Sequence, residues 1–164
     1  MFKQRKEPLA PPPITATVVP RAVLPNTSFP KKKILLVDDD AVVTKILSFT
    51  LKSRGYEVLT ATDGSEALAL MRDDTPDMLL IDVGLEPDVN LQWDGFQVTD
   101  WIRRVNGKIP TIIISGSDDL EFAERAAAAG AQAYFAKPID TDHLLASIAS
   151  ALAGFPQEIT VAYR

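Results

Sequence analysis

KKKILLVDDD, residues 31–40, decides the fold class of this chain. Four apolar residues in succession, Ile34 to Val37, are typical of a strand that is covered on both faces. Three aspartates follow directly, and Asp40 can accept hydrogen bonds from the first backbone N–H groups of a helix. Beyond it, apolar residues recur at the spacing of one helical face: Val43, Ile46 and Leu47. The stretch predicts a buried strand, an acidic turn and an amphipathic helix.

The same alternation of a short apolar strand and an amphipathic helix continues to residue 153. Further strands are predicted at residues 56–61, 78–81, 109–114 and 133–136, each followed by a helical pattern. Five strands alternating with five helices predict an α/β domain, a doubly wound parallel sheet with helices on both faces. Binding sites in such open sheets lie at the carboxyl ends of the strands, where the winding direction reverses.

Composition narrows the class of protein further. The chain has 164 residues, of which 46% are hydrophobic, so one domain with a sizeable core is expected. It contains no cysteine, which excludes disulfides and thiolate metal sites and is typical of a reducing, cytoplasmic environment. No apolar run approaches the ~20 residues that span a membrane. We expect a cytoplasmic protein without a membrane partner.

Residues 1–31 differ from the rest and are predicted to be a proline-rich basic leader. Seven of the twelve prolines lie in the first thirty residues, and residues 1–33 hold seven Lys and Arg against one acid. Proline removes backbone donors and favours extended chain, so we expect a flexible leader, with a docking arm as the alternative. The remainder of the chain is strongly acidic, and we expect it to bind no nucleic acid.

The residues at the predicted strand ends form a chemically coherent set. Asp38 and Asp39 follow the first strand, Asp82 the third, Ser115 ends the fourth and Lys137 follows the fifth. If the first and third strands are neighbours, three carboxylates share one crevice and raise one another's pKa unless a cation neutralises them. Mg²⁺ suits such oxygen ligands. The Lys137 ammonium and the Ser115 hydroxyl can then stabilise a phosphoryl group during its transfer. An aspartate is then the natural phosphoryl acceptor.

Four sequence runs together resemble the receiver domain of two-component response regulators. These runs are KKKILLVDDD, PDMLLID, PTIIISGSDD and AYFAKPID, each at a predicted strand end. The resemblance covers residues 32–153 and leaves residues 154–164 as a short C-terminal tail. It implies a flavodoxin-like (βα)5 three-layer sandwich with parallel strand order 2-1-3-4-5. It also implies a stand-alone receiver, or the receiver part of a larger protein.

The resemblance assigns roles to the residues at the strand ends. It makes Asp82 the phosphoacceptor and Asp38 and Asp39 the acidic pair, with Mg²⁺ held by these three carboxylates and the backbone carbonyl of Gly84. Ser115 is the implied switch hydroxyl. Lys137 is expected to contact the phosphoryl oxygens, and its peptide bond to the following proline is expected to be cis.

The resemblance also implies an activity. The phosphoryl group comes from a histidine kinase or a histidine phosphotransfer protein and is lost by partly self-catalysed hydrolysis, so the chain is not a conventional enzyme. Phosphorylation is expected to draw Ser115 and the aromatic switch residue Tyr134 inward. A downstream effector protein then recognises the face formed by the fourth helix, fifth strand and fifth helix, which could also form a homodimer.

The loop after Asp82 departs from the family pattern. Gly95, which opens the third helix, follows Asp82 by thirteen positions, because residues 83–94 form a longer loop than the family usually has. This leaves two alternatives. The chain could be a phosphorylation-inactive receiver-like interaction module. It could instead be a hydrolase with an aspartyl-phosphate intermediate, but such enzymes commonly carry a second acid at the position that Gly84 occupies. Trp93 could close over the site or stand exposed for a partner.

Overall fold

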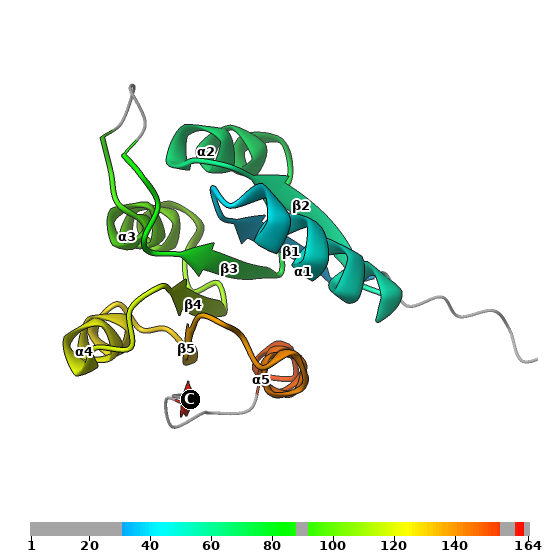
Figure 1. Cartoon of the computed structure of the whole chain (residues 1–164). Helices are drawn as coiled ribbons and strands as arrows, with labels where there is room; N and C mark the ends of the chain where they lie inside the picture. The colour runs from blue at the N-terminus through cyan, green and yellow to red at the C-terminus, as the bar shows by residue number, and fades with distance from the viewer. Residues whose placement is uncertain (1–30, 88–91, 155–159, 163–164) are drawn as a thin grey trace, which may run out of the picture.

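The computed structural model describes residues 31–87, 92–154 and 160–162 (Figure 1). Apart from its last residue, the predicted leader lies outside these ranges, as does part of the lengthened loop. Among the helices described, none combines the length and apolar character that a membrane crossing requires.

Parallel strands and helices alternate as predicted. The strands are β1 (Lys33–Val37), β2 (Glu57–Ala61), β3 (Met78–Asp82), β4 (Thr111–Ser115), β5 (Ala133–Ala136) and β6 (Thr160–Ala162). The helices are α1 (Ala41–Ser53), α2 (Gly64–Asp73), α3 (Gly95–Asn106), α4 (Leu120–Ala128) and α5 (Thr141–Leu152). The sheet order is β2-β1-β3-β4-β5-β6, which confirms the predicted order of the first five strands.

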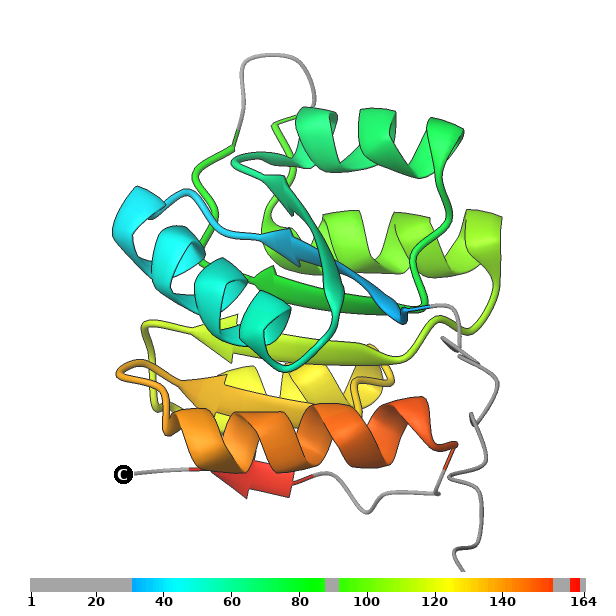
Figure 2. The ribbon, with the colours of Figure 1, turned by 90° about the vertical axis from the view of Figure 1, so that its right-hand side faces the viewer.

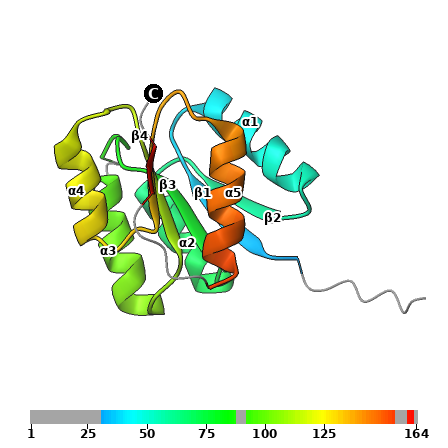
Figure 3. The ribbon, with the colours of Figure 1, turned by 90° about the horizontal axis from the view of Figure 1, so that it is seen from below.

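Helices cover both faces of the sheet, as the unbroken apolar strands predict. Figure 1 shows α2, α3 and α4 on one side and α1 and α5 on the other, and Figure 3 shows the same division from below. Two apolar clusters result. Leu79, Ile81 and Ile113 pack under α2, α3 and α4, whereas the alternate residues Leu80 and Ile112 pack under α1 and α5. The sheet is therefore the central layer of a three-layer sandwich.

The ends of α1 follow the sequence, but its buried face differs from the prediction. Asp40 caps the helix by accepting hydrogen bonds from the N–H groups of Val42 and Val43. Leu47 is buried as expected, whereas Ile46 is 58% exposed. The helix is turned so that Leu47 and Leu51 contact the sheet, which leaves a second apolar stripe facing outward.

A sixth strand was not predicted. Thr160–Ala162, within the supposed C-terminal tail, forms a short strand along β5 (Figure 2). The pairing is parallel, and Tyr134 lies opposite Val161. Three residues are too short for a periodic signal in the sequence, so this strand is visible only from its tertiary pairing. It extends the sheet beyond β5, and it covers a backbone edge that would otherwise have unpaired N–H and C=O groups.

Candidate functional site

The strand order brings the predicted site residues to one end of the sheet. Val37 of β1 lies opposite Ile81 of β3, so the next residues of the two chain segments, Asp38 and Asp82, lie side by side at the ends of neighbouring strands. Ser115 is opposite Ala136, and the backbone N–H of Lys137 donates to the Ser115 carbonyl at 2.7 Å. The register alone therefore places two acids, Asp38 and Asp82, on adjacent strands next to Ser115 and Lys137.

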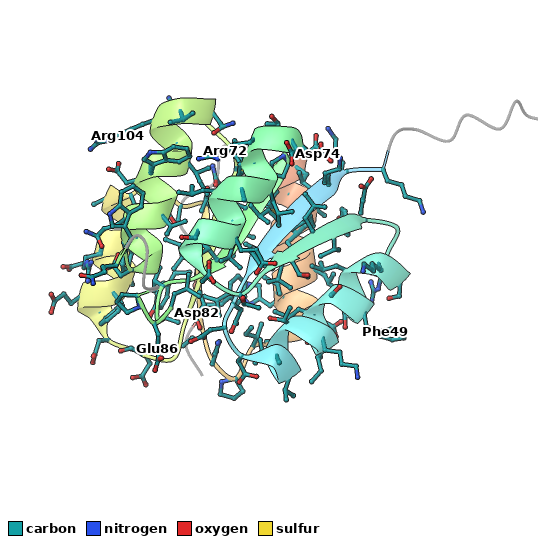
Figure 4. All side chains as sticks on the ribbon, turned by 90° about the horizontal axis from the view of Figure 1, so that it is seen from above. Phe49, Arg72, Asp74, Asp82, Glu86 and Arg104 are labelled. Carbon is teal, nitrogen blue, oxygen red and sulfur yellow. The ribbon has the colours of Figure 1, made fainter. Side chains whose placement is uncertain are left out.

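Three carboxylates form the acidic cluster that the sequence predicted. Asp38, Asp39 and Asp82 each offer an oxygen, and these oxygens lie within 4.8 Å of one another. Asp38 is 0% exposed and Asp82 is 4% exposed, whereas Asp39 faces solvent. Figure 4 shows Asp82 at one end of the molecule, with Glu86 of the lengthened loop nearby. The cluster is thus reached from solvent through Asp39 but is mostly enclosed.

Lys137 bridges the two buried acids. Its Nζ lies 2.6 Å from Asp82 Oδ2 and 2.9 Å from Asp38 Oδ2. Burial works against the charged form of this lysine, but the close contacts with the Asp82 and Asp38 carboxylates outweigh that effect and raise the pKa of Lys137. The ammonium therefore stays charged and offsets part of the negative charge in the cluster.

Asp38 is the least satisfied group of the site. Burial raises its pKa, and the ion pair with Lys137 and a hydrogen bond from the Asp40 N–H oppose that shift only in part. Among the described residues, nothing donates a well-oriented hydrogen bond to Asp38 Oδ2, although the Lys137 ammonium is near. A buried carboxylate oxygen whose nearest cation is an ammonium shared with Asp82, beside two further carboxylates, belongs to a ligand set that suits a hard divalent cation. The predicted Mg²⁺ ligands Asp38, Asp39 and Asp82 fit such an ion.

Two glycines anchor the loop that follows the predicted acceptor. The N–H of Gly84 donates to Asp82 Oδ1 at 2.6 Å. Gly95 packs so closely that an added Cβ would lie 2.3 Å from the Asp82 carbonyl oxygen and 2.6 Å from the Val83 Cα. Both ends of the lengthened loop therefore touch the Asp82 segment. The backbone carbonyl of Gly84 remains a predicted metal ligand.

The end of the loop is also held by α4, which the sequence did not predict. Asp94 caps α3 in a reciprocal capping box with Gln97. The Arg125 guanidinium lies 3.6 Å from Asp94 and 4.1 Å from the centre of the Phe96 ring. Trp93 is partly buried against the core, beside Gln97 and Trp101 of α3, so it does not stand fully exposed; closure over the site stays a prediction. Arg125 carries no local sequence signal, because its partners come from another helix.

Ser115 and Tyr134 meet at a shared neighbour. The Ser115 side chain is buried, and its Oγ accepts a hydrogen bond from the Ser117 N–H at 3.0 Å. Tyr134 is fully buried, and its hydroxyl donates to the Ser117 carbonyl. Ser117 acts through its backbone, which explains why its part in the site could not be found from residue type. The Lys137–Pro138 peptide is cis, as expected.

The fold and these residues define a class of protein: a doubly wound α/β domain with a lysine-bridged acidic site at the carboxyl ends of its strands. Comparison with known proteins gives the family. The sequence profile of the family described as "Response regulator receiver domain" matches residues 34–149. This match spans most of the chain, and the chain belongs to that family.

Curated relatives carry the same domain within longer proteins. "Transcriptional regulatory protein ZraR" from Salmonella typhimurium is 37% identical over 123 residues, which cover 75% of this chain and 27% of that protein. "Probable transcriptional regulator ycf27" from Guillardia theta is 34% identical over 122 residues, which cover 74% of this chain and 46% of that protein. The chain thus spans less than half the length of these two relatives.

Solved structures share the fold over nearly their whole length. The CheY-like response regulator receiver domain protein from Methanospirillum hungatei JF-1 has a TM-score of 0.69 and 30% identity, covering 76% of this chain and 96% of its own. The chemotaxis response regulator CheY4 of Vibrio cholerae has a TM-score of 0.66 and 28% identity, covering 74% and 99%.

Proposed function

We propose that the chain is a phosphorylation switch that accepts a phosphoryl group on Asp82. The observation that carries this proposal is the Lys137 ammonium, held 2.6 Å from Asp82 and 2.9 Å from Asp38, two almost fully buried carboxylates. A carboxylate in this position is a nucleophile with an adjacent cation already aligned. Such a preorganised charge is the main contribution that a protein makes to phosphoryl transfer.

The proposed transfer begins from a phosphohistidine of a histidine kinase or a phosphotransfer protein. A carboxylate oxygen of Asp82 attacks the phosphorus atom, the P–N bond breaks, and the histidine leaves with the bonding electron pair. Lys137 and the Ser115 hydroxyl donate to oxygens of the transferred group, once Ser115 releases its bond with Ser117. Later attack by water on the phosphorus atom returns the Asp82 carboxylate and inorganic phosphate.

Asp38, Asp39, Asp82 and the Gly84 carbonyl are the proposed ligands of Mg²⁺. When bound, the ion would offset negative charge on the phosphoryl oxygens. The role of this chain's residues is to hold the carboxylates together. Asp38 is fixed by the Asp40 N–H at 2.9 Å, and Asp82 by the Gly84 N–H at 2.6 Å.

The outward stripe of α1 is the proposed contact for the protein phosphodonor. Val42, Ile46 and Phe49 are 66%, 58% and 76% exposed, and Figure 4 shows Phe49 pointing away from the domain. Beside the stripe lies a groove of about 470 Å³ whose lining includes Ile46 and Lys137. An apolar helix face next to the reactive lysine fits an amphipathic helix that carries a phosphohistidine.

This contact is tested by comparing two donors. Phe49→Ala should slow transfer from the cognate phosphodonor protein on the order of tenfold, as expected for an interface anchor. It should leave phosphorylation by acetyl phosphate unchanged. Leu120→Ala is the control, because Leu120 is an apolar residue on α4 that is 65% exposed, against 76% for Phe49. Equal effects of the two variants with the protein donor would contradict the proposed contact.

The output of the switch is proposed to be a contact with a downstream effector protein, or with a second copy of the chain. The two relatives described above are titled as transcriptional regulators, but they are more than twice as long as the shared region. The contact of Lys137 with Asp38 and Asp82 favours the phosphorylation switch over the alternative of an inactive interaction module. The hydrolase alternative has Gly84 where its second acid would be.

The test of the proposal is intact-protein mass after incubation with acetyl phosphate. Wild type should gain one phosphoryl group in the presence of Mg²⁺ and none after chelation of the metal. Asp82→Asn should gain none in either condition. A chain that folds and binds Mg²⁺ but never forms the adduct would overturn the phosphorylation proposal and favour the interaction module.

A further inference from the structure

The C-terminal strand β6 lies beside the residue that is expected to switch. Tyr134 sits in β5 opposite Val161 of β6, with Ala133 opposite Thr160 and Phe135 opposite Ala162. All of β5 except Ala136 is therefore paired on this side, and on its other side it pairs with β4. Figure 2 shows β6 running along the outer side of β5.

This pairing changes where the Tyr134 ring can go. On the edge strand of a sheet, a side chain can rotate past the strand into solvent. Neighbouring strands lie about 4.8 Å apart, so a ring that turns toward a paired edge passes over the neighbouring strand instead of directly into solvent. Tyr134 is 0% exposed, and its hydroxyl is bonded to the Ser117 carbonyl on the inner side. The ring thus occupies the inward position, and β6 adjoins its outward route.

The inward position of Tyr134 is connected to the site through one residue. Ser117 gives its carbonyl to the Tyr134 hydroxyl and its N–H to the Ser115 Oγ. Any outward movement of Tyr134 breaks the first of these bonds and frees the β4–α4 loop that supplies both. The pairing of β6 with β5 therefore acts on the same loop that must rearrange if Ser115 turns toward a phosphoryl group on Asp82.

We propose that β6 is an intramolecular clamp that holds Tyr134 inward, so that the switch responds to a second input, the release of the C-terminal strand. The regulatory role rests on the proposed phosphorylation of Asp82; the clamp itself does not. The surface offered to an effector then includes β6, because the β5 edge is already occupied. A partner that pairs with β5 must displace β6 first, which is a form of β-strand exchange.

The clamp is tested in the full chain with 3-fluorotyrosine as the probe. Tyr56→Phe and Tyr163→Phe leave Tyr134 as the sole tyrosine, and the ¹⁹F shift is compared in H₂O and D₂O. Thr160→Pro and Val161→Pro are then added separately. Alternate N–H groups of a strand point to opposite sides, so one of the two removes a donor to β5 and the other removes an outward N–H.

The background protein should show a solvent-insensitive signal. One proline variant, but not the other, should show a second, solvent-sensitive signal that represents at least a tenth of the population. Val161→Gly keeps the backbone donor and should give a smaller change in the same direction, which covers the case in which the proline variants fail to fold. A solvent-insensitive signal in all folded variants would overturn the clamp. The added substitution Asp82→Asn should leave Tyr134 buried, whether or not the wild type forms the phosphoryl adduct.

Discussion

Acids and lysines gather at both ends of the same sheet, with opposite consequences. At the carboxyl end, Lys137 contacts Asp38 and Asp82, which are almost fully buried. At the amino end, Lys33 contacts Asp74 and lies 3.6 Å from Glu57. Figure 4 shows Asp74 and Asp82 at opposite ends of the molecule. The residue types are the same, and what differs is burial and the number of donors available to each acid.

At the amino end the acids are satisfied by the chain itself. Asp77 accepts from the Lys32 ammonium at 2.7 Å and from the Lys33 backbone N–H at 2.8 Å. Burial works against its charged form, but these hydrogen bonds outweigh it and lower the pKa of Asp77. At the carboxyl end, burial raises the pKa of Asp38. The charge of Asp77 therefore stabilises the fold at the amino end, whereas the charge of Asp38 costs stability at the carboxyl end. A buried charge that costs stability is typical of a functional site.

The largest expected effect separates the two lysines. Lys137→Met should slow phosphorylation by acetyl phosphate on the order of 10²-fold, because a preorganised cation beside the proposed acceptor Asp82 is lost. Mg²⁺ affinity should hold or rise, since Lys137 no longer competes for Asp38 and Asp82. Lys33→Met, at the other end, should leave the phosphorylation rate unchanged. The rates are measured by mass over time; a similar loss in both variants would remove the functional distinction between the ends.

The next effect concerns the packing beneath Asp82, the proposed acceptor. Gly95→Ala should cost about 1–3 kcal/mol of unfolding free energy, because its Cβ meets the backbone of Asp82 and Val83 and the core is overpacked. It should also slow phosphorylation by moving Asp82. Gly116→Ala is the control, since no atom of the described residues lies within 4 Å of the added Cβ. Urea denaturation measures both, and equal stability of the two variants would contradict the close approach at Gly95.

The smallest expected effect is on melting temperature, which should rise when Asp38 is neutralised and fall when Asp77 is neutralised. Burial raises the pKa of Asp38, so its charged form costs stability at neutral pH; Asp38→Asn should raise the melting temperature at pH 7 by a few degrees. The gain should vanish below about pH 4, where the wild-type carboxyl is protonated.

Asp77→Asn should behave in the opposite way. The pKa of Asp77 is lowered, so its charge contributes stability at neutral pH, and the variant should melt at a lower temperature at pH 7. That loss should shrink as the pH falls through the lowered pKa, because the wild type then loses the same contribution. Melting curves from pH 3 to 7 compare both variants, and changes of the same sign would contradict the contrast between the two ends.

The sequence predicted the fold and the clustering of Asp38, Asp39, Asp82 and Lys137, because both depend on local patterns and on register. Apolar runs gave β1 and β3, and a parallel sheet then placed Asp38, Asp82 and Lys137 together. Features that depend on contacts between distant segments were missed. Ile46 lies at helical spacing but faces outward, because rotation of α1 is set by its packing. The sixth strand and the contacts of Arg125 depend on tertiary neighbours that no local pattern records.

The residue that becomes phosphorylated distinguishes the carboxyl end of the sheet from the amino end most directly. Wild type is phosphorylated with acetyl phosphate and Mg²⁺, the acyl phosphate is reduced with borohydride, and the modified residue is located by peptide mass spectrometry. Reduction should convert Asp82 alone to homoserine. Conversion at Asp74 or Asp77, or no conversion in a folded chain that binds Mg²⁺, would contradict the assignment of the carboxyl end as the reactive site.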